Sequence, residues 1–265
     1  MYDEYHHSNS GCRKMLISIP IQLKTTINVY KLKTMKKFLL PLVLLFLVQM
    51  VHAQLGVHVG YRYNNAPDWK IVRSFDGEIE EFDILTEGLS FGVDVWFRLK
   101  NVRVEFLPEL NYSQFSTDVE TSEETIGLSS SFASLFVNTH IYFLDFFGDC
   151  NCPTFSKDGS TINKGIFLQV SPGLSYLTNT FDAENGKNTS SDFAFSIAAG
   201  LGIDIGISDL FTITPYGGLR YYPTVTWDNL NQITENYFLL DIKQEESTLV
   251  QPYFGIRLGF RFDKD

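Results

Sequence analysis

The fold of this chain is decided by the alternation in Leu89-Ser90-Phe91-Gly92-Val93-Asp94-Val95-Trp96-Phe97-Arg98-Leu99. A period of two puts the apolar side chains on one face of a β-strand and most of the others on the opposite face. That opposite face combines small residues with Asp94 and Arg98. Small and charged side chains suit a narrow interior better than a solvated surface, so we predict a strand whose apolar face points outward into lipid.

The same alternation recurs in seven further segments: 55–63, 102–112, 134–143, 166–176, 193–205, 211–221 and 250–262. Eight is an even number, and the segment lengths suit tilted transmembrane strands. We therefore predict an all-β fold, an eight-stranded antiparallel up-and-down transmembrane β-barrel. The alternative is a soluble β-sandwich or a lipocalin-like barrel, which would turn its apolar faces inward and favour Lys, Glu and Thr outside.

The composition agrees with this fold and excludes other classes. The 265 residues are 44% apolar and 15% aromatic, which is too much for a disordered chain. The mean hydropathy is -0.03, and a helical membrane protein would need several runs of about 20 apolar residues. A formal net charge of -10 argues against nucleic acid as a partner.

The N-terminal region predicts export. Two lysines precede the apolar run 38–51, and a small residue stands just before Gln54. This pattern is typical of a secretory signal peptide, and the run is too short for a retained transmembrane anchor. We expect location in the cell outer membrane and three parts of the chain: a misassigned extension over 1–34, or else an unusually long leader; a signal peptide over 35–53; and a barrel domain over 54–265.

The connections between the predicted strands sort into two lengths. Short turns lie at 100–101 and 206–210, and long polar segments lie at about 64–87, 113–130, 177–192 and 223–247. With both termini in the periplasm, the long segments all become external loops. Residues 1–53 hold 7 of the 21 basic and 2 of the 31 acidic side chains, so the barrel domain carries a net charge of -15. We predict that mobile acidic loops carry most of it. The connection 145–165 is the exception, because it is long yet expected on the periplasmic side.

Two short stretches resemble a known family. The third segment contains Leu107-Pro108-Glu109-Leu110-Asn111-Tyr112-Ser113, and the last contains Tyr253-Phe254-Gly255-Ile256-Arg257-Leu258-Gly259-Phe260-Arg261-Phe262. Together with the signal peptide and the eight strands, they resemble the PorT-like outer-membrane β-barrel proteins of Bacteroidota. The resemblance implies fold and location, and it transfers no catalytic residue. The ending is also similar to the strand signal that the barrel-assembly machinery recognises, which implies this machinery as a partner during insertion.

Charged residues concentrate on the predicted inward face. Six of the seven arginines of the barrel domain fall there with four acids: Arg62, Arg98, Arg103, Arg220, Arg257, Arg261, Asp94, Glu105, Glu109 and Asp204. A guanidinium group binds a carboxylate bidentately, and an unpaired charge in a confined lumen is costly. We predict that these residues form a charge network that fills the lumen. The alternative is a gated solute or ion path lined by the same groups.

Other residues carry weaker chemical signals. His58 and His140 are predicted to face inward and are candidates for a general base, but no GxSxG sequence accompanies them. Cys150 and Cys152 are too few for a metal site, and an oxidising compartment favours a disulfide between them, with free thiols as the alternative. We therefore predict no enzyme activity, no cofactor and no metal.

The external loops are the predicted contact surface. The last one holds an apolar patch, formed by Trp227, Tyr237, Phe238, Leu239 and Leu240. We expect a monomer with a structural or interaction role at the cell envelope, in contact with outer-membrane lipid, lipopolysaccharide and an envelope protein. The family resemblance adds an accessory role in protein secretion. The alternatives are a lipid-modifying outer-membrane enzyme and a narrow solute transporter.

Overall fold

The computed structural model describes residues 54–75, 78–99, 102–120, 125–145, 165–184, 186–208, 210–231 and 245–260. Several sequence-based predictions concern residues outside these ranges: the extension, the signal peptide, Cys150, Cys152, Arg261 and the patch residues Tyr237, Phe238, Leu239 and Leu240. Among the described residues, no helix is long and apolar enough to cross a membrane.

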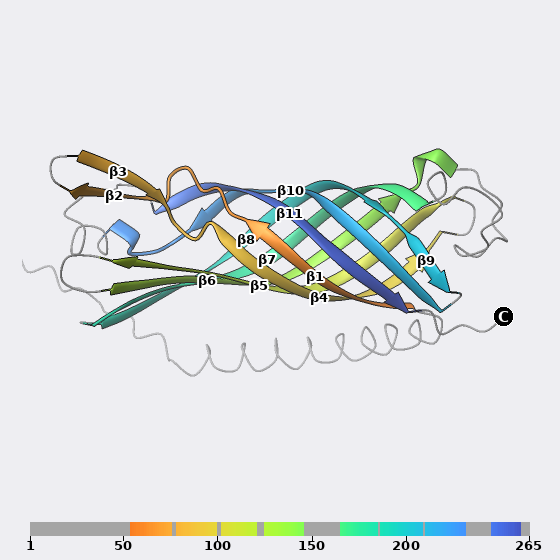
Figure 1. Ribbon diagram of the computed structural model, residues 1–265, viewed down its shortest axis with the longest axis horizontal. Coiled ribbons are helices and arrows are strands. Elements are labelled where there is room, and N and C mark those ends of the chain that lie inside the picture. Colours follow the sequence, from red (N-terminus) through yellow and green to blue (C-terminus); the bar gives the residue numbers. More distant parts are fainter. Residues whose placement is uncertain are drawn as a thin grey trace, which may run out of the picture. The chain divides into compact units, whose positions relative to one another are not determined.

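Eight strand positions close into an antiparallel barrel (Figure 1). In ring order they are β1 (Gln54–Tyr63), β4 (Glu87–Arg98), β5 (Val104–Glu120), β6 (Thr125–Ile141), β7 (Ile166–Ala183), β8 (Gly186–Ile203), β10 (Phe211–Thr226) and β11 (Glu246–Phe260). β1 pairs with β11 and closes the ring. The short β9 (Ile205–Ser208) continues β8 beyond Asp204 and also pairs with β10. The predicted fold class is confirmed.

Three smaller elements complete the structure. β2 (Lys70–Phe75) and β3 (Glu78–Asp83) form a separate two-stranded hairpin between β1 and β4. A short 3-10 turn, η2 (Phe143–Asp145), follows β6. β1 begins and β11 ends at the same end of the barrel, which we name the terminal end. We name the opposite end, near the β2–β3 hairpin, the far end.

The direction of the apolar faces is as predicted. On β4, the outward-facing Leu89, Phe91 and Val93 are more than half exposed, whereas the inward-facing Asp94 is 2% exposed. Aromatic side chains flank this outward apolar band, as in membrane barrels, where they lie at the two lipid–water interfaces. The far girdle contains Tyr63, Tyr112, Tyr176, Phe193, Tyr221 and Phe254, and the terminal girdle contains Phe97, Phe143 and Phe260.

Four strands continue well beyond the far girdle, which corrects two of the predicted loops. Residues 113–130 and 177–192 are mostly strand: β5 pairs with β6 out to Glu120↔Thr125, and β7 with β8 out to Ala183↔Gly186. The prediction of long loops there was wrong. The alternation continues in these segments, but the apolar residues there face inward. A prediction that requires apolar residues to face outward therefore ends each strand too early.

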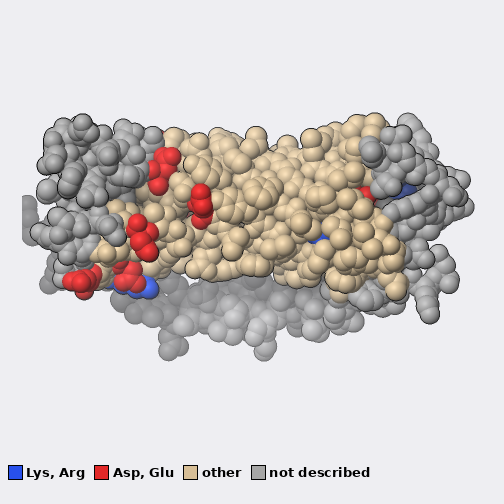
Figure 2. All heavy atoms as spheres, in the orientation of Figure 1, with Lys and Arg blue, Asp and Glu red and all other residues tan. Residues whose placement is uncertain are grey.

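Beyond the far girdle the polarity of the wall is inverted. Outward positions become polar, as in Gln114 and Ser116, while inward positions such as Phe115 and Phe132 become apolar and fully buried. The inward residues form one hydrophobic core with Ile126, Leu128, Leu177, Phe181, Tyr222, Val225 and Leu249. Figure 2 shows acidic side chains gathered near this end of the described surface. The barrel therefore has a lipid-facing section and a water-facing section built from the same strands.

Apolar side chains from the connections close the far end of the barrel. Trp69 and Trp227 are 3% and 1% exposed, with ring centroids 5.7 Å apart in a T-shaped arrangement. Leu85 lies beside them at 1% exposure and holds a φ of 59°, a conformation that a leucine adopts only when packing holds it there. Trp227 was predicted to be part of a surface contact patch, and that prediction was wrong because its side chain belongs to the core.

Candidate functional site in the barrel lumen

An ion pair with a histidine lies in the lumen toward the terminal end. Asp94 accepts two hydrogen bonds from Arg257, Nε to Oδ2 and Nη2 to Oδ1, both at 2.8 Å. His58 Nε2 lies 2.5 Å from the same Oδ2. The β1–β11 register sets His58 directly opposite Arg257. Gly56 lies opposite Asp94, and a Cβ there would overlap both members of the ion pair, so this glycine makes the close approach of the three groups possible.

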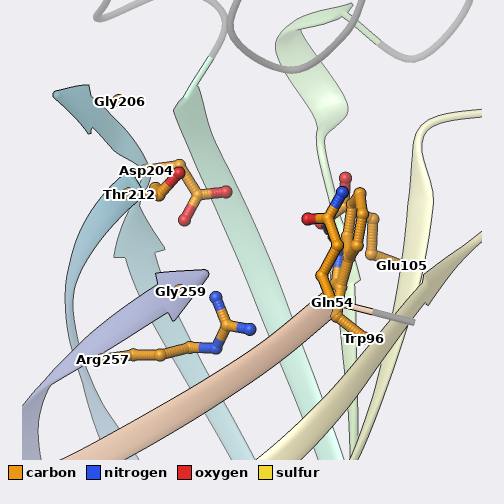
Figure 3. A pocket seen from close by; sticks show the side chains of 8 residues that line it. All are labelled: Gln54, Trp96, Glu105, Asp204, Gly206, Thr212, Arg257 and Gly259. Atoms are coloured by element: carbon orange, nitrogen blue, oxygen red, sulfur yellow. Dashed lines mark hydrogen bonds between the residues drawn. The ribbon is translucent and has the colours of Figure 1, made fainter. Parts of the chain in front are cut away.

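A second cluster lies nearer the mouth at the terminal end (Figure 3). Glu105 Oε2 accepts hydrogen bonds from Trp96 Nε1 at 2.5 Å and from the Tyr142 hydroxyl at 2.9 Å. The Tyr142 hydroxyl also contacts Asp204 Oδ2, and Thr214 donates to Asp204 Oδ1 at 2.5 Å. The Tyr142 hydroxyl therefore lies between the carboxyl groups of Glu105 and Asp204.

A small cavity of about 30 Å³ adjoins this cluster. Its lining includes Gln54, Trp96, Glu105, Asp204, Gly206, Thr212, Arg257 and Gly259 (Figure 3). Glu105 Oε1 and Thr212 Oγ1 are buried and have no hydrogen-bond partner within the described part of the chain. The cavity also presents the Arg257 guanidinium, which is a donor. A space of this size with both donors and acceptors suits one water molecule.

Amide side chains rather than arginines hold the acid in the middle of the lumen. Glu109 accepts hydrogen bonds from Asn111 Nδ2 at 2.8 Å and from Asn138 Nδ2 at 2.5 Å. Arg62 donates to Gln251 Oε1 at 2.9 Å and to Asn111 Oδ1 at 3.0 Å. Sequence reasoning missed these amides. Their position on the inward face of the alternation was the available signal.

Arg220 is held by hydroxyl groups and by an aromatic ring. It donates to Ser196 Oγ at 2.9 Å and to Ser171 Oγ at 2.8 Å. Its guanidinium lies 3.6 Å from the ring centroid of Phe136, and the Arg62 guanidinium lies 5.3 Å from the same centroid. A cation over an aromatic face is stabilised by the ring quadrupole. The Phe136 ring therefore contacts both arginines inside the polar lumen.

The structure sorts the predicted lumen charges into separate clusters. Asp94 and Arg257 form an ion pair, and Glu105 and Asp204 meet through Tyr142. The Arg103 guanidinium lies 4.4 Å from the ring centroid of Tyr142. Arg98 is half-buried and lies opposite Glu105 in the β4–β5 ladder. The remaining predicted charges that the structure describes, Arg62, Glu109 and Arg220, have the amide, hydroxyl and ring partners given above.

Both histidines that were candidates for a general base are buried. His58 contacts Asp94 and, at 3.4 Å, the Tyr216 hydroxyl. His140 is 5% exposed and stacks on Phe167 with ring centroids 3.8 Å apart. Within the described ranges, no group of three or more His, Cys, Asp or Glu side chains is arranged to hold a metal ion. Both histidine side chains therefore lie inside the lumen, His58 against an acid and His140 against an aromatic ring.

The contact between Phe136 and Gly173 gives a test of lumen packing. A Cβ at Gly173 would overlap the Phe136 ring and lie 3.1 Å from the Leu135 carbonyl oxygen. Gly173→Ala should therefore displace the ring that stabilises Arg220 and lower the free energy of unfolding by about 1–3 kcal/mol. Urea unfolding in detergent micelles, followed by tryptophan fluorescence, measures the loss.

Gly186→Ala is the matched control for this change. No atom lies within 4 Å of the position that a Cβ would take at Gly186. We expect unfolding of this variant within about 0.5 kcal/mol of the parent protein, as for most exposed substitutions. Equal stability of the two variants would show that the Phe136 ring moves aside without cost.

Comparison with known proteins identifies one family model and several similar structures. A model of the autotransporter beta-domain matches residues 73–265, which include every strand of the barrel except β1. The structure is similar to neisserial surface protein A, with a TM-score of 0.40 and 9% identity over 80% of this chain and 97% of that one. It is also similar to Ail, the attachment invasion locus protein of Yersinia pestis, with a TM-score of 0.39 and 13% identity over 80% and 99%. No curated protein sequence matches the chain.

Proposed function

Because this chain belongs to the autotransporter beta-domain family and is a β-barrel of the cell outer membrane, we propose that it works there as a closed barrel with a structural or interaction role. The terminal end faces the periplasm and the water-facing section of the wall projects from the cell. The role is to hold a rigid polar surface above the membrane for contact with other envelope components.

One observation carries this proposal, namely that buried side chains occupy the interior from the Glu105 cluster to the far end, with a small cavity of about 30 Å³ beside that cluster. The terminal part of the lumen holds the Asp94 and Glu105 clusters. The middle holds Glu109 with its amide partners and the Phe136 ring beside Arg62 and Arg220. Above them lies the hydrophobic core, which Trp69 and Trp227 complete at the far end. Apolar packing excludes water, so we infer that this core blocks a path for solutes through the barrel.

The contact surface that we propose is the water-facing wall of β5, β6, β7 and β8. Cross-strand pairing places small hydroxyl residues in a row, with Ser116 opposite Ser129, Ser129 opposite Thr180, and Thr180 opposite Thr189. A paired sheet presents a surface of fixed shape, so a partner binds it with little loss of conformational entropy. The partners that we propose are lipopolysaccharide and an envelope protein. The PorT-like resemblance supports an accessory role in protein secretion as the finer form of this proposal.

Several further features belong to the same proposal. The barrel acts as a monomer, binds no nucleic acid and has no catalytic role, since both lumen histidines are buried away from lipid. The aromatic and apolar alternation of β11 (Glu246–Phe260) supports insertion by the barrel-assembly machinery. A narrow solute transporter and a lipid-modifying enzyme are the competing functions. The transporter is disfavoured by the filled lumen.

Electrical measurements test the closed barrel. We expect the refolded protein to give no stable open-channel steps in planar lipid bilayers, because the polar lumen ends at an apolar core. The Arg220→Ala variant should also give no open-channel steps, since the substitution leaves that core intact. Stable steps whose size changes with Arg62 or Arg220 substitution would instead support a transporter.

Site-specific photocrosslinking tests the contact surface in the same cells. A photoreactive residue at Thr180, on the water-facing wall, should capture an envelope protein or lipopolysaccharide. The same residue at Leu168, which is 43% exposed on the lipid-facing band of the same strand, is the matched control and should capture only bulk membrane lipid. Identical products at the two positions would refute the wall as a contact surface.

A further inference from the structure

An apolar groove lies on the outside of the barrel at the level of the far girdle. It has a volume of about 400 Å³ and is lined mainly by Leu110, Ala133, Leu135, Leu174, Tyr176 and Phe193. These residues come from β5, β6, β7 and β8 and face outward. The groove is therefore open to whatever surrounds the barrel, and Asn111 and Ser134 of the barrel wall also border it.

A single small residue creates this groove. Along one row of the sheet, Tyr112 lies opposite Ala133, Ala133 opposite Tyr176, and Tyr176 opposite Phe193. Three of the four members are aromatic, and the methyl group of Ala133 leaves a gap between two tyrosines. The row below it, Leu110, Leu135 and Leu174, extends the gap toward the middle of the lipid-facing band.

The walls of the groove are apolar surface that the protein itself does not cover. Leu110 is 62% exposed and Phe193 is 68% exposed, although Tyr176 and Phe193 contact one another with ring centroids 4.9 Å apart. Such a surface is stable only against lipid or another apolar partner. Because the groove lies at the edge of the lipid-facing band, the acyl chains of membrane lipids surround it.

The row immediately above the groove has a different chemistry. Gln114 lies opposite Ser131, Ser131 opposite Thr178, and Thr178 opposite Ser191. All four face outward, and each carries an uncharged hydroxyl or amide group that both donates and accepts hydrogen bonds. Groups of this kind match the hydroxyl and amide groups of a sugar. We call these four residues the hydroxyl row.

We propose that this groove and the hydroxyl row form a binding site for one lipopolysaccharide molecule, with an acyl chain along Ala133 and a sugar on the hydroxyl row. The acyl chain gains contact with the exposed leucines and aromatic rings. The sugar meets neutral hydrogen-bonding groups at the height where the wall changes from apolar to polar. This site rests on the orientation proposed above, with the far end outside the cell, and makes the lipopolysaccharide contact specific. A barrel with the same orientation but no envelope partner would keep the site, so the lipid test and the crosslinking test can fail separately.

The test compares lipid retention by native mass spectrometry of the full-length mature barrel. The protein is reconstituted in nanodiscs that contain lipopolysaccharide and phosphatidylethanolamine, then released in detergent. We expect a species with one lipopolysaccharide from the parent protein. Ala133→Phe fills the groove and should remove that species. Ala199→Phe makes the same change at another outward alanine, on β8 opposite Val170 and outside the groove, and should retain it.

A variant in the hydroxyl row tests the sugar-binding half of the site separately from the groove. Its result does not depend on whether the Ala133→Phe variant folds. Ser131→Ala keeps the groove and removes one hydroxyl group, so it should lower the lipopolysaccharide-bound fraction while the folded band on an unheated gel stays unchanged. Four results would overturn the proposal: no bound species, equal retention by Ala133→Phe and Ala199→Phe, equal retention of phosphatidylethanolamine, or a dimer lost in Ala133→Phe. The last would assign the groove to a second copy of the chain.

Discussion

Asp94→Ala is expected to lower the free energy of unfolding by about 3–5 kcal/mol, because it leaves a buried arginine without its partner. Asp94 is 2% exposed and Arg257 is 7% exposed, and the two hydrogen bonds between them are both 2.8 Å long. Removing the carboxylate also deprives His58 of its closest polar contact. Urea unfolding in micelles and the heating temperature at which the folded gel band disappears measure the effect.

Two controls define the cause of this loss. Asp182→Ala removes an acid from the exposed pair with Lys187, in which the two side chains are 59% and 62% exposed and 3.3 Å apart. We expect that change to cost less than about 1 kcal/mol, as for other surface pairs. Asp94→Leu combined with Arg257→Met replaces both charges with apolar side chains and should recover most of the lost stability. Equal losses in Asp94→Ala and Asp182→Ala would show that the lumen is as well hydrated as the surface.

Trp227→Ala is the second change with a large expected effect. Its indole is 1% exposed and packs edge to face on Trp69, so truncation leaves a cavity in the core that closes the far end. Losses of about 3–5 kcal/mol are typical for truncation of a buried tryptophan. The same unfolding measurements apply, and the variant should also give leak currents in planar bilayers that the parent protein lacks.

Leu210→Ala is the control for the tryptophan truncation. Leu210 is 59% exposed in the turn before β10, so its truncation removes little buried surface, and we expect a change within about 0.5 kcal/mol. If Trp227→Ala unfolded like Leu210→Ala, the tryptophan would be a surface residue, as the sequence alone had predicted, and the sealed far end would have to be abandoned.

The lipid-facing section of the fold was predictable because it follows one repeated rule. In 89–99, each step of two residues returns to the same face, so the side-chain directions of β4 followed without any tertiary information. The water-facing section was missed because the rule holds there with the opposite sign. Leu135 points outward and Phe132 inward, three positions apart on the same strand. Which face is apolar depends on whether lipid or water surrounds the strand, and that changes at the far girdle.

The candidate site was predictable in its members and not in its pairings. Alternation placed Asp94, Glu109, Arg220 and Arg257 inside the barrel, where the structure also places them. It did not reveal that Arg257 pairs with Asp94 while Glu109 binds Asn111 and Asn138. Partners across a lumen depend on the tilt and stagger of the strands, which no local pattern encodes.

By itself, the sequence determined the barrel, the lipid-facing part of each strand and the side of the wall that faces lipid, because strand periodicity is a property of neighbouring residues. Only the tertiary structure decided where the barrel leaves the membrane, that Trp227 closes the far end, and that Ala133 opens a groove between Tyr112 and Tyr176. Each of these features joins residues from different strands. The register between strands and the closure of the ring bring them together.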